Sequence, residues 1–97
     1  MIEILDRTRL IEICEHNDIV FLGVFGSFAR EESTAGSDVD LLARFSKRKG
    51  LLDLVRVERE FSEALGKPVD LLTEASISPY LRERIKNEVK VIYEKTR

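Results

Sequence analysis

Apolar positions along the chain alternate between helical spacing and continuous runs. Residues 2–16 place apolar side chains at the spacing of one buried helical stripe, which predicts an amphipathic helix with Cys14 in the core. The uninterrupted run at 19–25 is rich in β-branched and aromatic residues, and such a run is typical of a strand buried on both faces. We therefore expect a first helix followed by a central strand.

The rest of the chain continues this alternation. We expect a short helix at 28–32, a turn at 33–37, a strand at 38–45 and the longest helix at 51–65, with Gly66 as its C-terminal cap. A strand at 69–72, a loop at 76–79, a charged helix at 80–87 and an edge strand at 89–93 complete the pattern. This order predicts an α/β (α+β) fold in which helices flank a small mixed sheet of about four strands.

Composition agrees with a single globular domain that spans residues 1–97. Of the 97 residues, 43% are hydrophobic and 35% are charged, which excludes a disordered or multidomain chain. The 16 basic and 18 acidic residues leave a formal net charge of -2. The whole molecule therefore offers no strong attraction for nucleic acid or for an anionic membrane.

Targeting and cysteine content point to a cytoplasmic protein. The apolar runs fall far short of the roughly 20 residues that span a bilayer, and the N-terminus lacks the features of a secretory signal. A single cysteine, Cys14, cannot form an intramolecular disulfide, and a single histidine, His16, argues against a zinc cluster. We therefore expect no structural zinc.

Two carboxylates lie two residues apart at the start of the second predicted strand. Because side chains alternate between the faces of a strand, Asp38 and Asp40 share one face while Val39 takes the other. Paired carboxylates beside an apolar sheet repel each other unless a cation lies between them or the strand end is open to water. A solvated strand end is therefore the alternative to a metal site.

A third aspartate, Asp70, interrupts the apolar strand at 69–72. If this strand pairs with the strand at 38–45, three carboxylates gather at one site of hard oxygen ligands, the kind that Mg²⁺ prefers. The alternative is a charge that discourages aggregation at the edge of a sheet.

Gly26 and Ser27 follow the central strand and open the next predicted helix. Backbone N–H groups at such a helix start favour a phosphate, glycine lets the phosphate approach closely, and the serine hydroxyl adds a donor. No Gly-Lys-Ser/Thr sequence follows, so the segment is not a Walker A loop. An ordinary turn or helix cap is the alternative.

Three segments together carry a resemblance to a known family: Gly26-Ser27, Asp38-Val39-Asp40 after a ten-residue spacer, and Asp70. They resemble the nucleotidyltransferase superfamily related to DNA polymerase beta, and the spacing is similar to the signature of its minimal nucleotidyltransferases. The resemblance extends over nearly the whole chain. One position departs from the family pattern, because Glu31 stands where glycine usually follows Ala-Arg. This departure bears on the loop before the second strand more than on the carboxylates.

The resemblance implies a nucleotidyltransferase that depends on two Mg²⁺ ions and uses ATP. It implies that Asp38 and Asp40 bind both ions and that Asp70 completes the catalytic-metal site and accepts a proton. Gly26 and Ser27 would then hold the triphosphate. Arg30 could neutralise phosphate charge, although a surface salt bridge is an equal alternative.

The resemblance also implies a partner protein. Minimal members of the family are commonly encoded beside a HEPN-domain protein, and the pair act as antitoxin and toxin, with AMP transferred to a tyrosine of the toxin. The expected function is thus transfer of AMP from ATP to a protein hydroxyl. One alternative is a non-catalytic nucleotide-binding module that neutralises its partner by contact. A small two-metal nuclease is a second alternative, which the Gly-Ser turn and the acidic charge balance disfavour.

The remaining polar and aromatic residues have ordinary structural interpretations. We expect His16 to interact with the C-terminal dipole of the first helix, and the basic run at 47–49 to form a solvated turn. Tyr80 and Tyr93 are expected to pack on the core. Periodicity leaves open whether apolar surface on the first or last helix forms a homo-oligomer or a heterocomplex interface.

Overall fold

The computed structural model describes residues 7–26, 29 and 38–95. Its helices and strands follow in the order α1 (Arg7–His16), β1 (Ile19–Phe25), β2 (Val39–Phe45), α2 (Leu51–Leu65), β3 (Val69–Thr73), the short 3-10 helix η2 (Glu74–Ser76), α3 (Pro79–Glu88) and β4 (Lys90–Glu94). The four predicted strands are confirmed, each to within one residue at either end. Apart from Ala29, the helix predicted at 28–32 lies outside the described residues, as do residues 2–6 of the first predicted helix.

The four strands form one mixed sheet in the order β3-β2-β1-β4. β1 pairs antiparallel with both β2 and β4, and β2 pairs parallel with β3. The predicted central position of β1 and the predicted pairing of the strands at 38–45 and 69–72 are therefore confirmed. The predicted fold class, a small mixed sheet flanked by helices, is confirmed as well.

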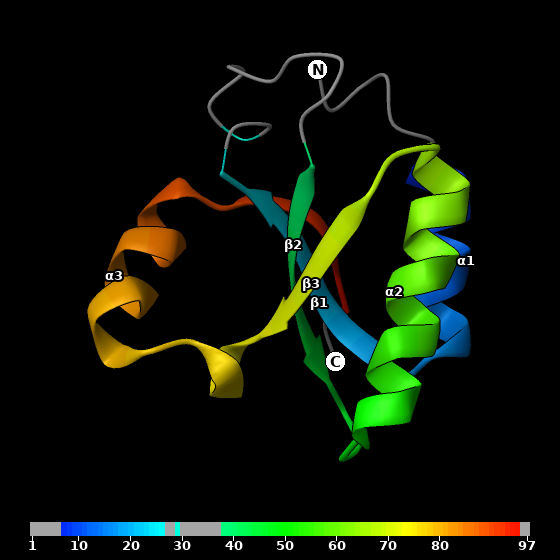
Figure 1. The fold of residues 1–97 in the computed structure, drawn as a ribbon, viewed down its shortest axis with the longest axis horizontal. Helices are drawn as coiled ribbons and strands as arrows, with labels where there is room; N and C mark the ends of the chain where they lie inside the picture. Colours follow the sequence, from blue (N-terminus) through cyan, green and yellow to red (C-terminus); the bar gives the residue numbers. More distant parts are fainter. Residues whose placement is uncertain (1–6, 27–28, 30–37, 96–97) are drawn as a thin grey trace.

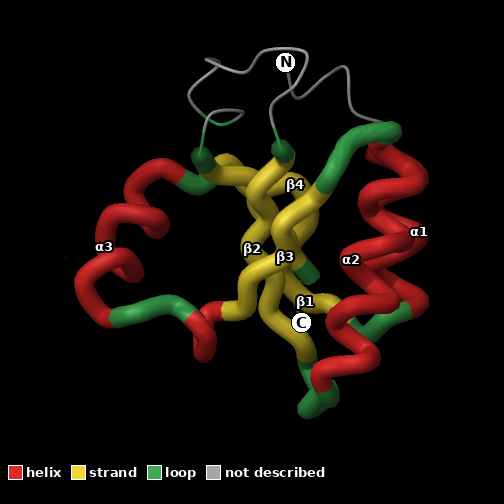
Figure 2. The backbone as a smooth tube through the Cα atoms, viewed as in Figure 1, coloured by secondary structure: helices red, strands yellow, loops and turns green. Residues whose placement is uncertain are grey.

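Helices cover both faces of the sheet. α1 and α2 lie together against one face, and α3 lies against the other (Figures 1 and 2). Within the described part of the chain, a core of twelve buried side chains joins α1 and α2 to the sheet, and it includes Cys14, Val57 and Phe61. A smaller core of four buried side chains joins α3 to the opposite face: Phe25, Leu42, Ile77 and Ile85.

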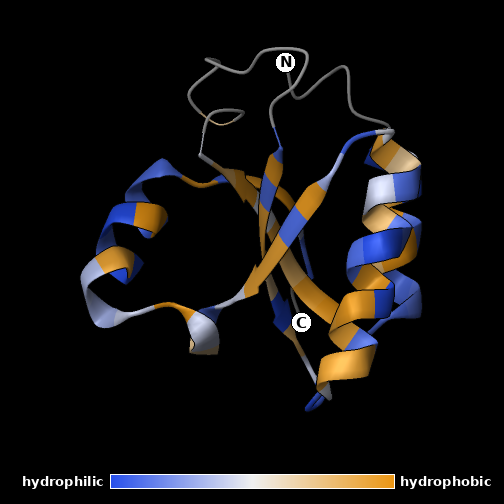
Figure 3. Cartoon of the chain, viewed as in Figure 1, coloured by the Kyte–Doolittle hydropathy of each residue, from blue (hydrophilic) through white to orange (hydrophobic). Residues whose placement is uncertain are grey.

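Side-chain alternation along β2 separates these two cores. Val39, Leu41 and Ala43 belong to the larger core, whereas Leu42 belongs to the smaller one. Since neighbouring strand residues face opposite sides, Asp40 shares the α3 face of the sheet with Leu42. Colouring by hydropathy shows hydrophobic residues through β1 and β2, interrupted on β2 by hydrophilic ones (Figure 3).

α2 begins and ends where the sequence predicts. Gly66 ends it in the left-handed conformation, with φ 69° and ψ 23°, and donates its N–H to the carbonyl of Ser62. Two of its residues, Val57 and Phe61, are buried. Leu51 and Leu52, in its first turn, are 76% and 84% exposed. The inner face of α2 is therefore anchored at its middle, while its first turn presents apolar side chains to solvent.

The edge strand β3 has side-chain partners for alternate backbone amides. Val69 N–H donates to Ser62 Oγ, and Thr73 N–H donates to Ser76 Oγ. Between them, Leu71 N–H donates to Glu58 Oε2 at 2.9 Å. Because unpaired amides on an edge strand invite pairing with another chain, these three side chains protect the edge.

Two details differ from the sequence-based expectations. Tyr80 is 93% exposed, so the expectation that it packs on the core is wrong. The reason is its place directly after Pro79 at the start of α3, whose one buried residue is Ile85. Tyr93, in contrast, packs partly buried against the larger core, as predicted. The 3-10 helix η2 was not predicted, and it is held by reciprocal capping between Thr73 and Ser76.

The helices of the described residues are too short or too polar for a membrane span.

Candidate active site

Parallel pairing of β2 with β3 brings two of the predicted carboxylates together. Asp40 pairs in register with Asp70, so their side chains start from the same face of neighbouring strands, which lie about 4.8 Å apart. Asp70 is exposed and Asp40 is half-buried. The pair therefore lies at a solvent-accessible position on the α3 face, near the start of both strands.

Gly26 lies directly beside the Asp40 carboxylate. It follows the last residue of β1, Phe25, which pairs with Asp40 across the sheet. A Cβ added to Gly26 would overlap Asp40 Oδ2 and lie 3.3 Å from Asp40 Cγ. Gly26 also has a φ of +72°, a left-handed conformation that glycine adopts without steric cost. The structure thus explains the glycine by two independent requirements.

Asp38 lies one residue before β2 and is exposed. The next residue, Val39, anchors the start of the strand by donating its N–H to the carbonyl of Pro68 at 2.9 Å. Within residues 7–26, 29 and 38–95, His, Cys, Asp and Glu side chains do not gather in threes closely enough to hold a metal ion. The structure therefore brings Asp40 and Asp70 together through the sheet register and leaves Asp38 at the adjoining strand end.

The donor chemistry of this corner suits a hard divalent cation. Carboxylate oxygens are the ligands that Mg²⁺ prefers, and Mg²⁺ is usually held by one or two carboxylates together with water and substrate phosphate. Asp40 and Asp70 supply two such groups from adjacent strands. A Mg²⁺ site therefore fits the residues that are present.

A hollow of about 210 Å³ adjoins Gly26 and was not anticipated from the sequence. It is lined by Phe25 and Gly26 from the end of β1 and by Leu81, Arg84, Ile85 and Glu88 from α3. Arg84 is exposed, and its Nε lies 3.4 Å from Glu88 Oε2. The spacing of these four α3 residues indicates a single helical face. No sequence signal relates that face to Gly26, since their contact depends on how α3 crosses the sheet.

The other predicted site residues lie apart from this corner or outside the described residues. The described part of the chain does not include Ser27, Arg30 and Glu31. His16 is the exposed last residue of α1. In the basic run, Lys47 and Arg48 are exposed as expected, whereas Lys49 Nζ forms an ion pair with Asp18 Oδ2 at 3.0 Å. This bond, and the other lysines nearby, lower the pKa of Asp18.

Comparison with known sequences gives matches over most of the chain. A family model described as polymerase beta, nucleotidyltransferase matches residues 8–97. A Methanocaldococcus jannaschii protein with the provisional name protein adenylyltransferase is 45% identical over 82 residues, covering 84% of this chain and 88% of the relative. The protein adenylyltransferase MntA of Thermococcus cleftensis is 33% identical over 78 residues, covering 80% of this chain and 79% of the relative.

Solved structures share the fold. One with the provisional name minimal nucleotidyltransferase has a TM-score of 0.77 at 36% identity, covering 87% of this chain and 86% of that chain. A toxin–antitoxin structure with AMP-PNP has a TM-score of 0.82 at 19% identity, covering 95% of this chain and 76% of that chain. A complex of tri-AMPylated Shewanella oneidensis HEPN toxin with MNT antitoxin has a TM-score of 0.71 at 18% identity, covering 92% and 70%. For the two structures at 19% and 18% identity, the similarity shows a shared fold alone.

Proposed function

Because this chain belongs to the polymerase beta nucleotidyltransferase family, we propose that it transfers AMP from ATP to a hydroxyl group of a partner protein. It is a nucleotidyltransferase, and its relatives include proteins named as protein adenylyltransferases. The observation that carries the proposal is the in-register pairing of Asp40 with Asp70. Adjacent carboxylates suit the metal ions on which enzymes of phosphoryl and nucleotidyl transfer depend.

The partner that we propose is a HEPN-domain toxin, for which this chain would be the antitoxin. The structures that share its fold include toxin–antitoxin assemblies, one with AMP-PNP and one with a tri-AMPylated HEPN toxin. Attaching AMP to a hydroxyl places a charged phosphate and a bulky nucleoside on the toxin surface. Such an addition can abolish an interaction through repulsion and steric exclusion.

We propose that Asp38, Asp40 and Asp70 bind two Mg²⁺ ions. When bound, Mg²⁺ stabilises charge on the phosphates and lowers the pKa of an attacking hydroxyl. Support comes from the donor chemistry and from Gly26, whose missing side chain leaves room for the Asp40 carboxylate.

We propose that Gly26, Ser27 and Arg30 bind the triphosphate of ATP. For Gly26 the support is its place beside Asp40; for Ser27 and Arg30 it is their position in the sequence motif. Arg84, which lines the hollow beside Gly26, adds a cation that a phosphate could approach.

In the proposed reaction, the acceptor hydroxyl oxygen attacks the α-phosphorus of ATP. A new oxygen–phosphorus bond forms as the bond from the α-phosphorus to the bridging oxygen of pyrophosphate breaks, and pyrophosphate leaves with that oxygen. The hydroxyl proton passes to the Asp70 carboxylate as general base. Since Asp70 is exposed, it can release the proton to water after transfer.

We place this activity in the cytoplasm, which supplies ATP and keeps thiols reduced. Cys14, the single cysteine, is a buried free thiol.

Intact-mass spectrometry tests the proposed function directly. The purified chain is incubated with each of the four nucleoside triphosphates and Mg²⁺, alone and together with the HEPN-domain protein that we propose as its partner. We expect the partner to gain the mass of one or more AMP groups with ATP. The Asp38→Ala/Asp40→Ala variant should produce no gain, because its metal ligands are lost.

Two results would change the interpretation. Binding of the partner without mass gain from any nucleotide would favour a module that neutralises its partner by contact alone. A gain that persists in the double variant would show that the chemistry resides elsewhere.

A further inference from the structure

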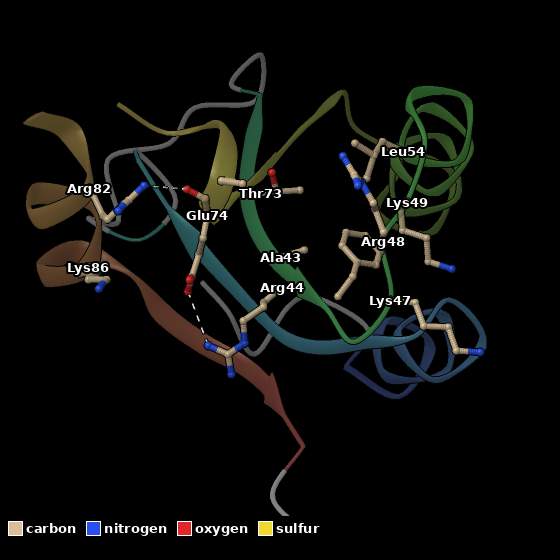
Figure 4. Close-up of a pocket in the computed structure, with 12 residues that line it drawn as sticks. Ala43, Arg44, Lys47, Arg48, Lys49, Leu54, Thr73, Glu74, Arg82 and Lys86 are labelled. Atoms are coloured by element: carbon tan, nitrogen blue, oxygen red, sulfur yellow. Dashed lines mark hydrogen bonds and ion pairs between the residues drawn. The ribbon is translucent and has the colours of Figure 1, made fainter. Parts of the chain in front are cut away.

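A basic depression of about 590 Å³ opens beside Arg44 and Thr73 (Figure 4). These residues lie at the ends of β2 and β3, whereas Asp40 and Asp70 lie near the starts of the same strands. Six basic side chains from three segments line it: Arg44 of β2, Lys47, Arg48 and Lys49 of the following loop, and Arg82 and Lys86 of α3. We call these six residues and the space between them the basic depression. Its volume lies within the range of natural ligand sites, about 300–1,000 Å³.

Most of the positive charge in the basic depression is not neutralised by neighbouring carboxylates. Arg44 forms an ion pair with Glu74 at 3.6 Å and lies over the ring of Phe21, and Lys49 forms an ion pair with Asp18. Arg82 donates to the backbone carbonyls of Glu74 and Ile77. For Lys47, Arg48 and Lys86, no ion pair is formed within the described part of the chain.

This concentration of charge is unusual for a chain with a formal net charge of -2. Of the charged side chains that line it, six are basic and one, Glu74, is acidic. A concave surface with such an excess of one sign of charge focuses the electrostatic field and attracts groups of opposite charge. The basic depression is therefore built for a ligand with several negative charges.

An apolar surface adjoins the basic depression. A second hollow of about 350 Å³ shares Leu54 and Thr73 with it and continues along the first turns of α2. There Leu51 and Val55 line the hollow and are 76% and 46% exposed. Exposed aliphatic side chains beside a charged rim are typical of a protein-binding surface.

The basic depression lies within reach of a protein bound at the candidate active site. Asp40 and Arg44 are both on the α3 face of β2, four residues apart, which corresponds to about 13 Å at about 3.3 Å per residue. A protein that presents a hydroxyl to the carboxylates can therefore contact the basic depression at the same time.

We propose that the basic depression and the adjoining apolar hollow dock an acidic segment of the acceptor protein that also carries aliphatic side chains. This inference rests on the proposed function for the identity of the acceptor. Docking at this second point holds the acceptor hydroxyl at the carboxylates and so lowers the KM for the acceptor. Single-stranded RNA fits less well, because such ligands are usually held by exposed aromatic platforms, and the exposed apolar residues that line the adjoining hollow, Leu51 and Val55, are aliphatic.

The test compares two triple variants that each remove three positive charges. Lys47→Gln/Arg48→Gln/Lys86→Gln changes the basic depression, and Arg7→Gln/Arg59→Gln/Lys95→Gln changes exposed positions elsewhere. AMP transfer to the HEPN-domain protein gives KM values for acceptor and for ATP. Titration calorimetry without ATP gives the affinity for the acceptor, and a fluorescent 12-nucleotide RNA reports nucleic-acid binding.

We expect the first variant to raise the KM and the Kd for the acceptor about tenfold, without changing the KM for ATP or the thermal unfolding midpoint. The control variant should change the acceptor KM less than twofold, and about 0.5 M salt should remove the difference between the variants. An unchanged acceptor Kd in the first variant would overturn the inference. RNA binding that depends on the basic depression while the acceptor Kd stays constant would overturn it in favour of a nucleic-acid site.

These measurements separate the inference from the proposed function. If wild-type protein binds the acceptor through the basic depression but transfers no AMP, the docking surface stands and the transferase proposal fails. If AMP is transferred and the acceptor Kd is independent of the basic depression, the transferase proposal stands and the docking inference fails.

Discussion

Gly26 is the residue at which backbone geometry and the candidate chemistry coincide. Its φ of +72° favours glycine, and a Cβ there would overlap the Asp40 carboxylate. Gly66 has a similar φ of +69° but open space where a Cβ would lie. The two glycines therefore separate the effect of backbone strain from the effect of displacing Asp40.

We predict that Gly26→Ala and Gly66→Ala each lower the free energy of unfolding by about 1 kcal/mol, because alanine is strained in the left-handed region. Gly26→Ala should also lower the rate of AMP transfer by about 100-fold, because small displacements of catalytic groups are costly. Urea unfolding and the intact-mass assay measure the two effects. Equal activity in both variants would show that the position of Asp40 does not depend on Gly26.

Cys14 provides a second prediction at this scale. Burial, with a smaller contribution from Glu15, raises the pKa of its thiol to about 12, compared with about 8.5 for a free cysteine. We predict that native protein at pH 8 reacts with a disulfide reagent at least about 100-fold more slowly than protein unfolded in guanidinium, since the thiolate is the reactive form. A fast native reaction would mean that α1 opens readily.

The raised pKa of the Cys14 thiol also makes a contribution to the free energy of unfolding that depends on pH. The unfolded chain loses the thiol proton above about pH 8.5, whereas the folded chain retains it until about pH 12. The contribution is complete below pH 8.5 and is lost as the pH rises toward 12. Comparing wild type with Cys14→Ala across this range isolates it from other groups.

Residue types and spacing predicted part of the candidate site. Period-two alternation placed Asp40 opposite Val39 and Leu41, and the packing of these two residues in the larger core confirms it. The apolar context of Asp70 predicted a strand that could pair with the strand of Asp40, and the register of β2 with β3 confirms that pairing. Arg84 was missed because its proximity to Gly26 arises from a helix that follows two strands later. Tyr80 was misjudged because aromatic character alone does not tell which side of a helix faces the sheet.

At the scale of elements, α2 completes the hydrogen bonding of the edge strand β3. Glu58 and Ser62 lie one turn apart on α2 and accept from Leu71 N–H and Val69 N–H. These two side-chain oxygens accept the hydrogen bonds that the backbone carbonyls of a further strand would otherwise accept. The helix thus covers apolar residues of the sheet and protects its edge at the same time.

Removing one of these acceptors should destabilise the fold. We predict that Glu58→Ala lowers the free energy of unfolding by about 1–2 kcal/mol, because the Leu71 amide loses its charged acceptor. Glu58→Gln, which keeps an acceptor oxygen, should cost less than about half of this. Urea unfolding measures the effect, and Glu63→Ala, the same change at an exposed position of α2, is the control. Equal losses at the two positions would contradict the protective role of Glu58.

Local patterns predicted the strands and α2 well, because each is signalled by a run of apolar residues or by helical spacing within the segment. η2 escaped prediction because its stability comes from two short polar side chains, Thr73 and Ser76, in reciprocal contact. Register shifts between Ile19 and Phe21 and between Leu22 and Gly23 also carried no local signal. They depend on the facing strands.

At the scale of the whole molecule, the two faces of the sheet are unequally anchored. Among the residues that the structure describes, twelve buried side chains hold α1 and α2 to one face and four hold α3 to the other. Ile85 is the buried residue that α3 itself contributes. Yet α3 lines both the hollow beside Gly26 and the basic depression. The more weakly anchored helix is thus the one that borders both candidate binding surfaces.

This asymmetry predicts two levels of opening. Ile85→Ala, which removes about 2 kcal/mol or more of packing, should accelerate amide hydrogen exchange in α3 at least about tenfold while α1 and α2 stay protected. Phe61→Ala, in the larger core, should accelerate exchange in all three helices. Equal acceleration of α1 and α2 by Ile85→Ala would instead show that the molecule opens as a single unit. Binding of the acceptor protein to Ile85→Ala should restore protection in α3, because contacts with Arg82 and Lys86 would hold the helix to the sheet.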